Sequence, residues 1–82
     1  MQDQPIESLI AVAVGNVLGR PAETLGPEDG LDQTQGWDSL AHMSILLAVE
    51  QVIKQEFSAD ELLELRTFQQ IIDKARGKFQ CP

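Results

Sequence analysis

The chain has 82 residues, of which 43% are apolar, so it is long and apolar enough for one small domain with a single core. Thirteen acidic and six basic residues give a formal net charge of −7, which argues against nucleic acid as a partner because phosphate backbones would be repelled. Such a charge suits partners with basic patches, although it also serves solubility alone.

The single cysteine and the first residues add few constraints. Cys81 has no partner for a disulfide and no neighbouring histidine for a metal site, and its role stays open. The first five residues lack the basic and apolar regions of a signal peptide, and no apolar run approaches membrane-spanning length. We expect a cytoplasmic, monomeric, single-domain protein (1–82) without a membrane span, with a core over about residues 5–76 and a flexible tail at 77–82.

The first helix is predicted over residues 5–18. Apolar residues recur there at spacings of three and four, as on one face of a helix: Ile6, Leu9, Ile10, Ala13, Val17 and Leu18. Pro5 suits the first helical turn, where its missing N–H costs no hydrogen bond. Gly19 and Pro21 then indicate the end of the helix.

A long irregular segment is predicted between residues 20 and 38. It contains two prolines, three glycines and several acids, and connections of this length in a small domain are usually functional or disordered. Leu25 and Leu31 are its only large aliphatic residues, which predicts that they anchor it over the core. Trp37, near its end, either packs as a lid or contacts a partner, and we favour packing.

The second helix is predicted from Ser39 to about residue 55. Asp38 is its expected N-cap, because a carboxylate can accept from the free N–H groups at a helix start. One stripe consists of Leu40, Met43, Leu46, Val49 or Glu50, and Ile53, and further apolar residues widen the apolar surface to over half the circumference. A helix this apolar is buried on several sides or binds through part of its surface.

Two capping boxes predict the remaining helices. Ser58 with Glu61 opens a short helix to about residue 65, and Thr67 with Gln70 opens a last helix to about residue 76. No segment carries a convincing strand pattern. The predicted fold is all-α: a four-helix bundle of three main helices and one short helix, with a long first loop.

Ser39 is the candidate for chemistry, with its hydroxyl at a helix start beside flexible chain. As a nucleophile it would need a base and an orienting acid. His42 is the only histidine and lies three residues on, but no third group is evident, and we interpret His42 as a solvated surface residue. Metal-ligand spacing is absent. We therefore expect no catalysis by the chain, and Ser39 is better suited to the attachment of a group.

Residues 35–40, Gln-Gly-Trp-Asp-Ser-Leu, resemble the modification site of the acyl carrier protein family, in which an Asp-Ser-Leu tripeptide begins the second helix. The likeness continues at residues 48–50, 56–61 and 65–69, so it covers nearly the whole chain. It implies that Ser39 receives 4′-phosphopantetheine from coenzyme A through a phosphodiester bond, and that the thiol of this arm carries acyl groups as thioesters. Asp38 and Leu40 would flank this cofactor site, and Asp38 would also help a transferase and its metal to find it.

The resemblance also implies partners: a phosphopantetheinyl transferase, an acyl-loading enzyme, and a ketosynthase or acyltransferase of a polyketide, fatty-acyl or related specialised pathway. In the well-known fatty-acid carriers, acidic residues cover the exposed face of the second helix. The matching positions here carry little charge and comprise Leu40, Ala41, Ser44, Leu47 and Glu50. We therefore expect dedicated partner enzymes and recognition by apolar contact, with Leu40 and Leu47 as anchors.

Two other functions stay open. A carrier of aminoacyl or peptidyl groups in nonribosomal synthesis is the nearer alternative, although such carriers typically have a Gly-Gly-His-Ser-Leu site. An unmodified helical interaction module is the other. A further set of apolar residues either lines a cavity for an acyl chain or simply forms the core: Met43, Leu46, Ile53, Leu62 and Phe68.

Overall fold

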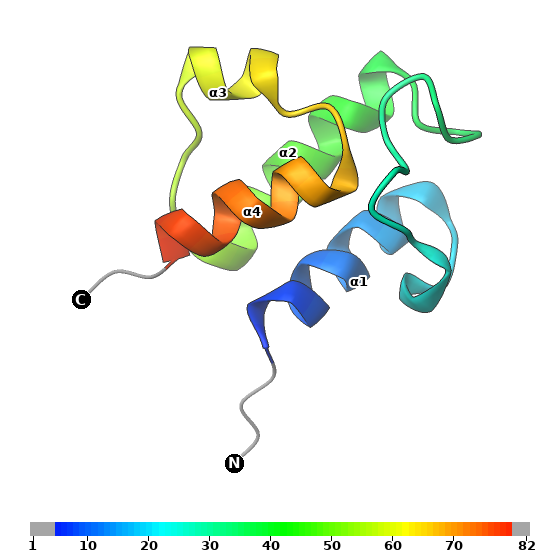
Figure 1. Cartoon of the computed structure of the whole chain (residues 1–82), viewed down its shortest axis with the longest axis horizontal. Coiled ribbons are helices and arrows are strands. Elements are labelled where there is room, and N and C mark those ends of the chain that lie inside the picture. Colours follow the sequence, from blue (N-terminus) through cyan, green and yellow to red (C-terminus); the bar gives the residue numbers. More distant parts are fainter. Residues whose placement is uncertain (1–4, 80–82) are drawn as a thin grey trace.

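A computed structural model describes residues 5–79 of the chain. It contains four α-helices and a short 3₁₀ helix in the long loop: α1 (Ile6–Leu18), η1 (Ala22–Thr24), α2 (Ser39–Ile53), α3 (Ala59–Glu64) and α4 (Phe68–Phe79) (Figure 1). Within these residues there is no strand, only an isolated bridge between Gly30 and Thr67. The predicted all-α fold is confirmed.

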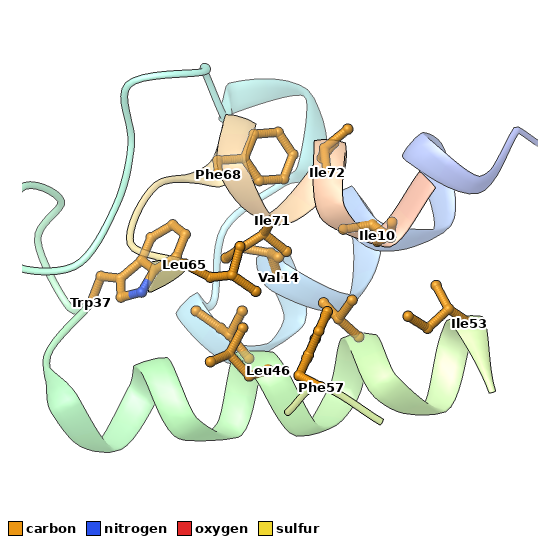
Figure 2. Packing of buried hydrophobic residues seen from close by; sticks show 13 residues of the cluster. Ile10, Val14, Trp37, Leu46, Ile53, Phe57, Leu65, Phe68, Ile71 and Ile72 are labelled. Carbon is orange, nitrogen blue, oxygen red and sulfur yellow. The ribbon is translucent and has the colours of Figure 1, made fainter. Parts of the chain in front are cut away.

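Helices α1, α2 and α4 pack against one another and enclose the core, while short α3 lies on the opposite side of α2 and α4 from α1 (Figure 1). Thirteen buried apolar residues form one cluster, in which Ile, Leu and Val predominate (Figure 2). Each large aliphatic side chain buried in this way contributes about 1.5–3 kcal/mol. Leu25 and Leu31 of the long loop pack against the cluster, as their isolation in the sequence predicts.

The helix ends follow the expected signals closely. Ser58 and Glu61 form a complete capping box at the start of α3, and the Thr67 side chain accepts from Gln70 N–H at the start of α4. Helix α1 ends at Leu18 with Gly19 as its C-cap. Pro5 differs slightly from expectation, because it lies just before the first turn. Its carbonyl accepts from the N–H groups of Ser8 and Leu9 at 3.0 and 3.3 Å.

The last helix is longer than predicted. Helix α4 continues past residue 76 to Phe79, so residues 77–79 are helical and do not belong to a tail. One reason is an ion pair between Lys78 Nζ and Glu61 Oε1, 3.1 Å apart, which joins the last turn of α4 to α3. The rest of the predicted tail, residues 80–82 with Cys81, lies outside the described residues.

Hydrogen bonds to the start of α4 fix the long loop, although the sequence indicated that this loop is flexible. Leu31 N–H donates to Arg66 O at 2.9 Å, and Phe68 N–H donates to Asp29 O at 2.7 Å. The Asp29 carboxylate also accepts from Gly26 N–H and the Thr34 hydroxyl, and these two hydrogen bonds lower its pKa. The segment that precedes α2 is therefore part of the folded structure.

Gly30 allows this close approach, because a Cβ at this position would collide with Arg66 O and lie 2.9 Å from Thr67 Cα. We predict that Gly30→Ala lowers the free energy of unfolding by about 2 kcal/mol, measured by urea titration. Gly77→Ala is the matched control. A Cβ there meets nothing within 4 Å, so Ala in this helical position should stabilise by roughly 0.5 kcal/mol or more. Equal stability of Gly30→Ala and the unmodified chain would contradict the contact.

Candidate functional site

The buried face of helix α2 agrees with the predicted apolar stripe at Leu46, Val49 and Ile53 but differs from it near the helix start. Its buried residues are His42, Ile45, Leu46, Val49 and Ile53, at the spacing of one helical face. Leu40 and Met43 of the predicted stripe are exposed, and Leu47 is exposed with them. The start of α2 therefore presents an apolar surface to solvent.

Ser39 is the first residue of α2 and is exposed. Asp38 is the predicted N-cap: its Oδ1 accepts from Ala41 N–H at 2.9 Å. Gly36 has a φ of 87°, a backbone conformation that favours glycine, and it turns the loop toward this cap. The Ser39 hydroxyl has no hydrogen bond to any described residue, so it is available for reaction.

His42 is buried, with 6% of its surface exposed, so its interpretation as a solvated surface residue was wrong. Its Nδ1 accepts from Trp37 Nε1–H at 2.8 Å, and its Nε2 lies 2.7 Å from Leu65 O. The Trp37 indole is itself only 1% exposed, which confirms the prediction that it packs. The Trp37 indole N–H and both ring nitrogens of His42 are thus hydrogen-bonded inside the core.

These contacts determine the protonation of His42. An indole N–H can only donate and a carbonyl can only accept, so Nδ1 carries no proton and Nε2 carries the single proton of a neutral imidazole. Burial lowers the pKa of His42 below its ordinary value of 6.5, which favours the same neutral state. Because both ring nitrogens are engaged, His42 does not offer Ser39 a free base.

A cleft of about 200 Å³ opens beside Ser39, between α2 and α3. Its lining is mostly aliphatic and includes Met43 and Leu62, two of the five residues for which a cavity or a core role was open. The other three, Leu46, Ile53 and Phe68, belong to the core. Arg66 also lines the cleft, although no sequence pattern pointed to it as a site residue.

The expected partner face has a mainly apolar surface. Leu40 is 78% and Leu47 56% exposed, Ser44 is exposed, and Ala41 is half-buried. Glu50, also half-buried, has a structural contact, because its Oε2 accepts from Phe57 N–H at 2.9 Å. Leu63 of α3 is 77% exposed and was not predicted.

The comparisons with known proteins agree with this geometry. A family model described as a phosphopantetheine attachment site matches residues 8–74, which is most of the chain. The chain belongs to this family. The resemblance to acyl carrier proteins is thereby confirmed, and so is 4′-phosphopantetheine as the covalent cofactor. No curated protein matches the chain significantly.

The residues present fit such a group. A carrier needs a nucleophilic side chain that another enzyme can reach, and Ser39 supplies an exposed hydroxyl without a competing hydrogen bond. Domains of this family are carriers rather than catalysts and interact with transferases and biosynthetic enzymes. Among residues 5–79 there is no cluster of side chains suited to a metal ion and no helix long and apolar enough to cross a membrane.

The buried histidine of this carrier predicts a pH-dependent stability. Because the pKa of His42 is lowered in the folded state, the unfolded chain binds a proton more readily, and the free energy of unfolding falls as the pH drops below 6.5. The slope is at most about 1.4 kcal/mol per pH unit. Urea unfolding, followed by Trp37 fluorescence from neutral pH to about pH 5.5, measures it above the range of most carboxylates.

His42→Gln is the control, because a glutamine amide can both accept and donate but does not titrate in this range. The slope between neutral pH and about pH 5.5 should be lost in this variant. An equal slope in both proteins would show that His42 is not its source.

Proposed function

We propose that the chain is an acyl carrier protein in which Ser39 bears the phosphopantetheine arm. In the loading reaction, Ser39 Oγ attacks the phosphorus that bears pantetheine in coenzyme A. The new O–P bond forms as the pyrophosphate P–O bond breaks, adenosine 3′,5′-bisphosphate leaves, and the serine proton passes to a base of the transferase. The terminal thiol then carries acyl groups as thioesters.

The observation that supports this proposal most strongly is the accessibility of the Ser39 hydroxyl. The hydroxyl is exposed at the start of a capped helix, and the preceding loop is anchored to α4. The arm would therefore leave the protein in a defined direction. Asp38 caps the helix, and half of its carboxylate remains to approach a metal ion held by the transferase.

Mass spectrometry after incubation with coenzyme A and a broad-specificity phosphopantetheinyl transferase tests the attachment site. We predict the addition of one phosphopantetheine to the unmodified chain and none to Ser39→Ala. Ser8→Ala, an exposed serine on α1, is the matched control and should be modified normally. Modification that persists in Ser39→Ala would contradict the proposal.

For the partners, we propose enzymes of a polyketide, fatty-acyl or related specialised pathway that recognise an uncharged helix surface. Leu40, Ala41, Ser44 and Leu47 would form the contact, with Glu50 at its end. Helix α2 contains no other acidic residue and no lysine or arginine. Charged groups would therefore contribute little to partner binding at this surface. The removal of apolar area from water would provide most of the binding energy.

We predict that Leu40→Ala or Leu47→Ala lowers kcat/KM for modification by the transferase about tenfold, because an apolar anchor is worth about 1.4 kcal/mol. Val12→Ala is the control, since Val12 is 48% exposed and belongs to α1 rather than to α2. The kcat/KM of the unmodified chain should change little as ionic strength rises. A steep fall with salt, together with normal activity of both leucine variants, would indicate charge-based recognition instead.

A further inference from the structure

Arg66 and Ser39 line the same cleft although 27 positions separate the two residues in the sequence. Both line the cleft between α2 and α3, and Arg66 is the one residue of its lining that carries a charge at neutral pH. The charge of Arg66 also acts on His42, another residue of this lining. Burial is the largest cause of the lowered pKa of His42, and the positive charge of Arg66 lowers this pKa further.

The backbone of Arg66 is held while its side chain is exposed. Its carbonyl accepts from Leu31 N–H at 2.9 Å, and its N–H donates to Gln70 Oε1 at 2.9 Å. The ion pairs among the described residues involve Lys74, Arg76 and Lys78, and Arg66 takes part in none of them. Arg66 thus adds to the lining of the cleft a basic residue that has a fixed backbone and no ion pair among the described residues.

We propose that Arg66 binds the phosphodiester of the phosphopantetheine arm on Ser39 and thereby holds the arm along the cleft between α2 and α3. This inference rests on the proposed function. A guanidinium donates two parallel hydrogen bonds to phosphate oxygens, which makes arginine well suited to this group. The phosphodiester would otherwise add negative charge next to the Asp38 carboxylate, and Arg66 offsets that repulsion.

The rest of the cleft matches the part of the arm that follows the phosphate. Pantetheine carries a carbon with two methyl groups close to its phosphate end, and the cleft offers the aliphatic side chains of Met43, Leu62 and Leu63 there. Contact between these groups removes apolar surface from water. The arm would thus rest on its own protein until a partner enzyme draws it away.

Nuclear magnetic resonance of the modified protein alone tests this contact, after mass spectrometry has shown that the arm is present. We expect nuclear Overhauser effects from the two pantetheine methyl groups to the methyl groups of Met43 and Leu63. These effects should be lost in Arg66→Gln and partly retained in Arg66→Lys. In the arm-bearing protein without substitutions, they should weaken as ionic strength rises. Lys54→Gln removes the same charge at the opposite end of α2 and should leave them unchanged.

The outcomes separate the two proposals. A modified protein without these effects, or with effects that persist in Arg66→Gln, would overturn the role of Arg66 and leave Ser39 as the attachment site. Failure of the transferase to modify the chain at all would overturn both. Arg66 is exposed, so its variants should fold, and the Arg66→Lys protein provides a second test if the glutamine variant does not.

Discussion

The imidazole of His42 joins the three segments that surround the candidate attachment site. It accepts from the Trp37 indole at the end of the long loop, belongs to α2 itself, and lies against Leu65 O in the connection between α3 and α4. In the same connection, Arg66 O accepts from Leu31 N–H. The loop, the start of α2 and the start of α4 are therefore fixed relative to one another, and Ser39 lies one turn from this junction.

This arrangement combines a rigid base with an accessible surface. The buried side of α2 is fully engaged in the core, whereas its other side presents leucines and small residues around Ser39. Most of the acids that produce the net charge of −7 lie elsewhere, in the loop and on α3 and its flanks. The apolar surface around Ser39 is thus separate from most of the negative charge of this small protein.

Local signals in the sequence predicted local structure well. Side-chain caps placed the starts of α2, α3 and α4, because each depends on residues no more than three positions apart. His42 was misjudged because its partners are Trp37, across the loop–helix junction, and Leu65, 23 positions away. One signal was available: His42 shares its helical face with Ile45, Leu46 and Val49, and that spacing indicates a buried position. Arg66 near Ser39 is likewise a consequence of tertiary packing and leaves no pattern in the sequence.

The state of the His42 ring tests this account most directly. Nitrogen-15 resonance of the imidazole at neutral pH should show a neutral ring protonated at Nε2, with Nδ1 as a hydrogen-bond acceptor, and the Trp37 indole N–H should be protected from exchange with solvent. A charged ring, a proton on Nδ1, or a rapidly exchanging indole N–H would contradict the bridge and, with it, the explanation of how Ser39 is held in position.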